Sequence, residues 1–153
     1  MSLTKKIFII VLVLLIVIQF IRPEKNQSAA ATPNDIFTIH PSANDVTQLV
    51  KTACYDCHSN NTVYPWYSNI QPVAWWLDHH IEEGKKELNF SEFGTYEPKK
   101  ADHKLEELAE VVEEKEMPLK SYTLIHADSR LTDSQRELIV SWAKATRKQI
   151  APK

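Results

Sequence analysis

Two cysteines and a histidine lie close together in the chain, in the order Cys54-Tyr55-Asp56-Cys57-His58. The C-x-x-C-H spacing is that of an attachment site for c-type haem. Two thiols three residues apart at a helix end can reach both vinyl groups of one porphyrin edge and form thioethers. The adjacent imidazole can then bind the iron. The spacing therefore predicts one covalent haem c, attached through Cys54 and Cys57, with His58 as the proximal iron ligand.

Three other kinds of site could use two cysteines at this spacing. A structural zinc site needs four ligands, usually from a second Cys or His pair. The chain has 2 cysteines in all, and His79 and His80 would point about 100° apart on a helix. A thioredoxin-like dithiol belongs near a βαβ pattern, which this sequence lacks. A disulfide between Cys54 and Cys57 would close only a very small ring, so haem is favoured.

The surrounding sequence predicts helices that could position this motif. Glycine, which sheet-rich folds use in hairpins and bulges, occurs only 2 times. Apolar residues recur at helical spacing in four stretches. They cover about residues 44–53, 72–88, 102–116 and 132–143. The first leads directly into Cys54, and the third ends at Met117 because a residue before proline disfavours helical angles. We therefore expect an all-α domain.

The periodicity also predicts which side chains form the core. Each of the four helices is expected to turn one apolar face inward. These faces are Val46, Leu49 and Val50 in the first; Val73, Trp76, Leu77, His80, Ile81 and Leu88 in the second; Leu105, Leu108, Ala109 and Val112 in the third; and Leu138, Ile139, Trp142 and Ala143 in the fourth. Large aromatic side chains suit a small domain built around a porphyrin. On that ground we also expect Tyr64, Trp66, Tyr67, Trp75, Trp76 and Trp142 in the core.

The N-terminal region is apolar from Ile7 to Ile21, with Gln19 as its only polar residue. As a helix these residues would be roughly 22 Å long, short of the ~30 Å hydrocarbon core unless flanking residues contribute. A cleaved signal peptide could end at the alanines of residues 29–31. That site lies far beyond the apolar run, so we favour an uncleaved signal anchor or transmembrane segment over residues 1–25.

The rest of the chain divides into a tether and one domain. Residues 26–41 are polar and alanine-rich with two prolines, which indicates a flexible tether. Residues 42–150 then form the haem-binding domain. The chain carries 18 basic and 20 acidic residues, so it has no overall basic field, and a nucleic-acid partner is not expected.

Several short motifs outside the C-x-x-C-H site also form a recognisable set. They are Cys57-His58-Ser59-Asn60-Asn61-Thr62, Tyr64-Pro65-Trp66-Tyr67, Pro72-Val73-Ala74-Trp75-Trp76 followed by His79 and Gly84, Leu88-Asn89-Phe90-Ser91, Glu116-Met117-Pro118 with Tyr122 and His126, and Leu131-Thr132 opening a helix to Trp142. From about Pro41 to Trp142 the chain resembles the haem-binding domain family of exported bacterial proteins. The resemblance implies a monohaem, all-helical, cytochrome c-like domain, but no particular electron partner.

The resemblance also bears on the sixth iron ligand. It places a Met-Pro pair at Met117 and Pro118, and so implies Met117 as the distal ligand. A methionine there could instead only fill a gap in the core. His79, which matches a family histidine, and His80, on the apolar side of its helix, are the competing ligands.

Two classes of function fit such a haem. With His58 and Met117 both on the iron no coordination site is open, and the expected function is one-electron transfer with redox partner proteins. The alternative is a haem-based sensor or peroxidase-type enzyme in which the sixth ligand is labile. In either case the N-terminal segment predicts attachment to the cytoplasmic membrane, with the haem domain on its outer, periplasmic side.

Overall fold

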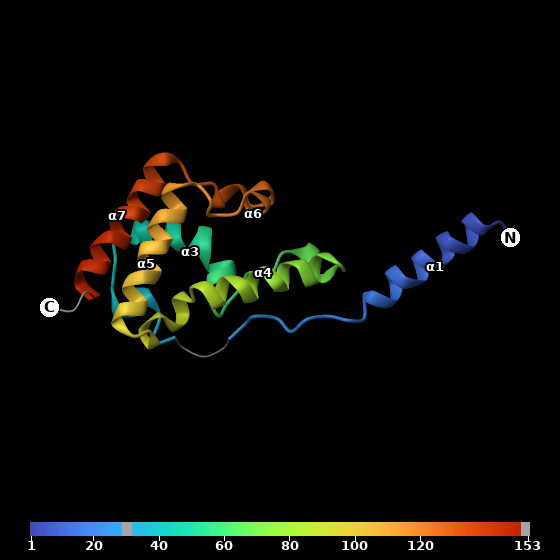
Figure 1. The fold of residues 1–153 in the computed structure, drawn as a ribbon, viewed down its shortest axis with the longest axis horizontal. Helices are drawn as coiled ribbons and strands as arrows, with labels where there is room; N and C mark the ends of the chain where they lie inside the picture. The colour runs from blue at the N-terminus through green and yellow to red at the C-terminus, as the bar shows by residue number, and fades with distance from the viewer. Residues whose placement is uncertain (29–31, 151–153) are drawn as a thin grey trace.

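A computed structural model describes residues 1–28 and 32–150 of the 153-residue chain. Over these residues all regular elements are helical, and the only β-type pairing is an isolated bridge between Gln27 and Asn61. The all-α prediction is confirmed. One helix projects from the N-terminal side of a compact helical body (Figure 1). The signal cleavage site considered at residues 29–31 lies outside the described residues.

The helices follow one another through short connections. They are α1 (Leu3–Ile18), α2 (Ile36–Ile39), α3 (Asn44–His58), α4 (Val73–Glu87), α5 (Pro98–Glu113), α6 (Lys120–Ile125) and α7 (Asp133–Ile150), with 3-10 turns η1 (Trp66–Asn69), η2 (Phe90–Thr95) and η3 (Ala127–Ser129).

The four predicted helices are present, with shifted ends. The first continues past residue 53 as α3, so the C-x-x-C-H motif forms its last turns. The third begins earlier, because Pro98 occupies the first turn of α5, where its missing N–H costs nothing. The fourth begins with a capping box, in which Gln135 N donates to Thr132 Oγ1 and Thr132 N donates to Gln135 Oε1.

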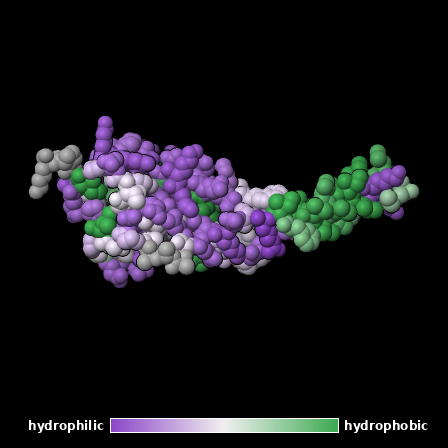
Figure 2. Space-filling model, turned by 90° about the horizontal axis from the view of Figure 1, so that it is seen from below, coloured by the Kyte–Doolittle hydropathy of each residue, from purple (hydrophilic) through white to green (hydrophobic). Residues whose placement is uncertain are grey.

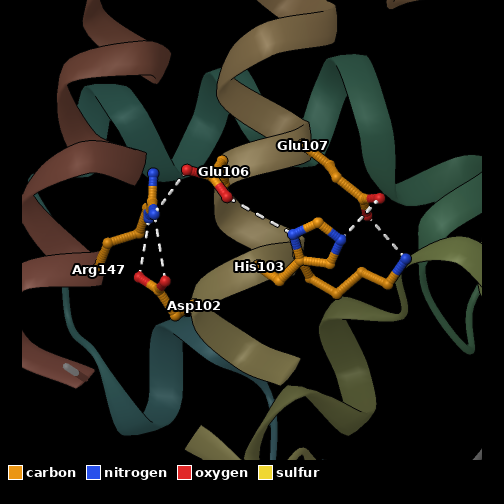
Figure 3. A network of polar contacts seen from close by, with 6 residues as sticks. Asp102, His103, Glu106, Glu107 and Arg147 are labelled. Atoms are coloured by element: carbon orange, nitrogen blue, oxygen red, sulfur yellow. Dashed lines mark hydrogen bonds and ion pairs between the residues drawn. The ribbon is translucent and has the colours of Figure 1, made fainter. Parts of the chain in front are cut away.

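The core lies between α5, α7 and α3. Leu105 and Ile139 are completely buried where α5 packs against α7, and the inward face predicted for α5 is confirmed. Ion pairs also cross this interface (Figure 3). Arg147 on α7 donates to Asp102 and Glu106 on α5. These contacts join the outer sides of α5 and α7.

The predicted inward face of α4 is partly wrong. Ala74 and Ile81 are buried, but Val73 and Trp76 are exposed. The amino-terminal end of α4 extends away from α5 and α7 toward α1, beyond the reach of the core (Figure 1). Hydrophobic periodicity shows that a helix has an apolar stripe, but it does not show how much of that stripe the neighbouring helices cover.

Most of the aromatic residues assigned to the core are also outside it. Among the tryptophans only Trp142 is buried, whereas Trp66 is 78% exposed and Trp75 and Trp76 are also exposed. The short η1 turn and the start of α4 hold these side chains at the edge of the domain, where no helix covers them.

The segment predicted as a flexible tether is instead largely fixed to the domain. Ile36, at the start of α2, is fully buried in the core. Asp35 caps α2 and accepts a 3.0 Å hydrogen bond from Tyr55 Oη on α3. At the other end Asn26 bonds the loop after α3. Polar composition predicted a flexible segment and could not indicate the specific partners that α3 and the loop after it supply.

The N-terminal helix α1 is 16 residues long and buries none of them; the six-residue α6 likewise has no buried residue. It covers most of the apolar run Ile7–Ile21 but ends at Ile18. Across residues 1–28 and 32–150, no helix reaches both the length and the hydropathy required to cross a membrane. Figure 2 shows α1 as a continuous hydrophobic rod joined to a mainly hydrophilic body.

Candidate functional site

The carboxyl end of α3 opens onto two adjoining cavities. The smaller, about 240 Å³, is lined by Cys54, Cys57, His58 and Met117 among others. The larger, about 400 Å³, shares Cys54, His58 and Met117 and continues along α5. Met117 lies 59 positions after His58 in the sequence, and the fold brings the two to the same cavities. All four predicted site residues therefore meet at one place.

The orientation of His58 is set by the main chain. Its Nδ1 lies 2.9 Å from the carbonyl oxygen of Leu88, directly after α4. A carbonyl oxygen can only accept, so Nδ1 must carry the hydrogen. Burial lowers the pKa of His58 and favours the neutral ring. A neutral imidazole that donates from Nδ1 has its lone pair on Nε2, which is the form that binds a metal.

The two cysteines are unbridged thiols in an environment that suppresses ionisation. Burial, with a smaller contribution from the neighbouring Cys57, raises the pKa of Cys54 to about 12. Burial and the charge of Asp56 raise the pKa of Cys57 to about 11. Dithiols that exchange disulfides depend instead on a lowered pKa. The site thus lacks the electrostatics of a thioredoxin-like centre.

The segment that carries Met117 is held from two sides. After α5 ends at Glu113, Lys115 adopts the left-handed region (φ 64°), and the N–H groups of Glu116 and Met117 both donate to Val111 O. From α7, Arg136 donates to the carbonyl oxygens of Val112 (3.1 Å) and Met117 (2.6 Å). The main chain at Met117 is therefore fixed beside the cavities.

The competing histidines, His79 and His80 on α4, line the same smaller cavity as Met117. Nδ1 of His80 lies 2.8 Å from Trp76 O, within its own helix. Among the described residues, no group of three or more His, Cys, Asp or Glu side chains could hold a metal ion. The zinc alternative thus has no ligand set in that part of the chain.

A close contact between helices shapes the wall of the smaller cavity. α4 crosses α3 at Gly84, where a Cβ atom would lie 2.7 Å from Cys57 O and 3.1 Å from Cys57 Cβ. Only glycine lets the two helix backbones approach this closely at Cys57.

Asp56, between the two cysteines, connects the motif to its surroundings. One carboxylate oxygen accepts from Val63 N (3.0 Å) and the other from Tyr122 Oη on α6 (2.7 Å). The Asp56 carbonyl oxygen accepts from Thr62 Oγ1 (2.6 Å). The loop after the motif and the helix after Met117 are thus joined at one residue.

The loop after the motif is also fixed to the segment that orients His58. Asn60 N donates to Ser91 Oγ, Asn60 Nδ2 donates to Glu92 Oε1, and Asn89 Nδ2 donates to Asn60 Oδ1. Asn89 directly follows Leu88, so these bonds keep the Leu88 carbonyl in place under the imidazole.

Sequence reasoning named Gly84 and Leu88 only within the motifs that resemble the family, and it missed that these two, Arg136 and Asn26 position the site. Arg136, Gly84, Asn26 and the Leu88 carbonyl belong to segments distant from the motif in sequence. Gly84 carried a usable signal, since it is one of only 2 glycines and lies inside a helix where glycine is unfavourable. The other three had no local signature.

A helical body whose cavities are lined by two thiols, an oriented neutral imidazole and a thioether defines the class of small helical haem-binding domains. The chain belongs to the haem-binding domain family, whose model matches residues 13–145. It is therefore a haem-binding protein, and the family resemblance noted in the sequence is confirmed. The match begins well before Pro41, in keeping with the order found over residues 32–41. Searches of curated proteins and of solved structures found no match.

Proposed function

We propose that this protein is a monohaem c-type cytochrome that transfers single electrons. In this proposal Cys54 and Cys57 attach the haem through thioethers, and His58 and Met117 are the axial ligands. The observation that carries the proposal is that all four side chains line the smaller cavity, and three of them, Cys54, His58 and Met117, also line the larger one. Their donor chemistry, two thiols, an imidazole nitrogen and a thioether sulfur, fits haem c.

Each residue has a distinct part in this function. Bound haem c supplies a reversible one-electron couple between ferric and ferrous iron. Leu88 O fixes the His58 ring, so that little reorganisation accompanies a change in charge at the metal. The Met117 thioether favours the ferrous state and raises the potential. Arg136 and Val111 hold the main chain of Met117 in place.

The second candidate function is sensing or peroxidase-type catalysis at a labile sixth position. His79 and His80, which line the smaller cavity, favour it. A distal histidine is the group that could transfer protons to a bound peroxide. This function requires Met117 to leave the iron or never to bind it, so the state of Met117 separates the two candidates.

We further propose that the protein acts at the outer surface of the cytoplasmic membrane, with α1 inserted in lipid. The apolar side chains of α1 are about half exposed throughout, from Ile7 at 53% to Val17 at 50%. In lipid, these apolar side chains stay exposed without the free-energy cost of contact with water. Soluble or membrane-bound redox proteins are the partners this location implies.

Covalent attachment is tested by producing the full chain in a host with cytochrome c maturation machinery. We expect haem to survive acid–organic extraction and to give a pyridine haemochrome spectrum of thioether-linked haem. Changing both Cys54 and Cys57 to alanine should abolish the covalent haem. A wild-type protein whose haem is fully extracted would refute the c-type proposal while leaving haem binding itself in place.

The axial pair is tested with Met117→Ala, because attachment does not use this residue. The ferric form should lose its weak sulfur-to-iron band and become high-spin or water-bound, and the ferrous form should bind carbon monoxide. His79→Ala and His80→Ala serve as controls and should leave the spectrum unchanged. A spectrum altered by a histidine variant but not by Met117→Ala would favour the second candidate function.

A further inference from the structure

Large apolar side chains are exposed at one end of the helical body. From residue 32 to residue 150, nearly all of them lie in two segments: Val63, Trp66, Ile70, Val73, Trp75, Trp76, Leu124 and Ile125, with only Ile39 elsewhere. We call these eight side chains the apolar end. By contrast α5 and α7 expose charged side chains to solvent. The distribution is too uneven for the scattered apolar residues of an ordinary surface.

The two segments of the apolar end form one surface. Trp66, Val73 and Trp76 line a groove together with Ile125 of α6. Cys57, His80 and Tyr122 line both this groove and the smaller of the two cavities at the motif. Four of the eight side chains, drawn from both segments, therefore meet in one groove, and this groove adjoins the haem site on its Cys57 side.

The apolar end also adjoins the point where α1 leaves the body. Gln71, which is buried just before α4, donates from Nε2 to Ile21 O (2.7 Å) and from its main-chain N to Gln19 Oε1 (2.9 Å). Gln19 Nε2 in turn donates to Gln71 O (3.3 Å). Gln71 lies next in sequence to Ile70, one of the exposed residues of the apolar end. These bonds fix the end of α1 beside that surface.

We propose that the apolar end rests on the lipid bilayer that receives α1, so that the haem domain is docked on the membrane surface and not tethered above it. The proposal rests on the insertion of α1 proposed above. Tryptophan is enriched at membrane–water interfaces, because its ring is apolar and its N–H is polar. The apolar end contains three of the 4 tryptophans in the chain. Docking places the Cys57 side of the haem site toward the membrane.

The argument for lipid, and against a second copy of the chain, is continuity with α1. A surface that begins where an apolar helix leaves the body meets the same bilayer as that helix. The hydrogen bonds between Gln19 and Gln71 leave little free chain between α1 and the helical body, so the body cannot move far from the membrane. A free tether would have allowed any orientation.

Lipid photolabelling tests this docking on the full haem-loaded chain. The protein is reconstituted into vesicles of phosphatidylethanolamine and phosphatidylglycerol that contain a lipid with a diazirine at headgroup depth, and labelled peptides are mapped by mass spectrometry. We expect label in peptides that cover residues 63–76 and 121–126. Peptides from α5 and α7 should carry at least several-fold less.

A charged variant and a matched control sharpen the result. Trp66→Glu combined with Ile125→Glu should reduce labelling of both segments while α1 stays labelled. Ser141→Glu, on the exposed side of α7, should change nothing. Label on α1 alone, or label on α5 and α7 equal to that on the two segments, would each overturn the docking proposal. A second lipid with the diazirine in its acyl chain should label α1; absence of that label would refute membrane insertion itself, and the haem spectrum tests the redox proposal separately.

Discussion

Arg136 on α7 donates a 2.6 Å hydrogen bond to the carbonyl oxygen of Met117, and the same Nη1 donates to Val112 O at the end of α5. One charged side chain thus ties the helix pair that forms the core to the segment that carries the proposed distal ligand. Hydrogen bonds from a charged donor are stronger than neutral ones. The position of Met117 therefore depends on a residue that does not line the cavities.

The first prediction follows from this contact. Arg136→Gln should leave the haem attached but loosen the Met117 segment, lowering the free energy of unfolding by about 1–3 kcal/mol. The ferrous protein should bind carbon monoxide faster, and the reduction potential should fall. Arg130→Gln is the matched control, because Arg130 also donates to main-chain carbonyls but on α6. Equal effects of the two variants on carbon monoxide binding would contradict the positioning role.

The second prediction concerns Gly84. Replacing it with alanine gains up to about 1 kcal/mol of helix propensity, whereas overpacking typically costs about 1–3 kcal/mol. The added Cβ would lie 2.7 Å from the Cys57 carbonyl oxygen. Because this oxygen belongs to the main chain and cannot move aside as a side chain could, we expect a net loss of stability and less haem per chain. Pyridine haemochrome titration and thermal unfolding measure both. Gly94→Ala, whose Cβ would lie no closer than 3.2 Å to Asn34, should have a smaller effect.

The third prediction tests whether residues before position 32 belong to the folded domain. Asn26 Nδ2 donates to Ser59 O and Thr62 Oγ1, and its Oδ1 accepts from Lys85 Nζ. Asn26→Ala leaves these groups without a partner and should lower stability by about 1–3 kcal/mol in guanidinium unfolding in detergent. Gln27→Ala removes only an exposed side chain and should be close to neutral. Equal stabilities would restore the flexible tether predicted from the sequence.

The fourth prediction is a pH dependence at the α5–α7 interface. Hydrogen bonds from Arg147 hold the pKa of Asp102 below its ordinary value. Because the pKa of Asp102 is lowered in the folded state, its ionised carboxylate stabilises the fold. This stabilisation is fully present above the ordinary pKa and is lost as the pH falls through the lowered pKa. Asp102→Asn should therefore reduce the melting temperature at pH 7, and the difference from wild type should shrink toward pH 3 and below.

The control for this prediction is Arg147→Gln. In that background Asp102→Asn should show little pH-dependent difference, because the charge that lowers the pKa is gone. A pH-dependent difference of unchanged size would assign the effect to other carboxylates around α5. Glu106 is the nearest such group, since it also accepts from Arg147 (Figure 3).

Residue types and short spacings by themselves determine much of this protein. The C-x-x-C-H spacing indicates haem, because two thiols three residues apart can form both thioethers and the adjacent histidine can bind the iron. Scarce glycine and the 3.6-residue period of Leu105, Leu108 and Val112 indicate helices, and the Thr132–Gln135 box marks where the last one begins. These signals are local, so a linear sequence carries them completely.

Tertiary structure alone decided the contacts between distant segments. Nothing near Arg136 in sequence indicates that it holds Met117, and nothing near Leu88 indicates that its carbonyl orients His58. The exposed tryptophans illustrate the same limit. The period of α4 predicts an apolar face, but only the position of α3 decides that Ile81 is covered and Trp76 is not. Burial and long-range hydrogen bonds depend on which elements pack together, and that choice is made by the whole chain.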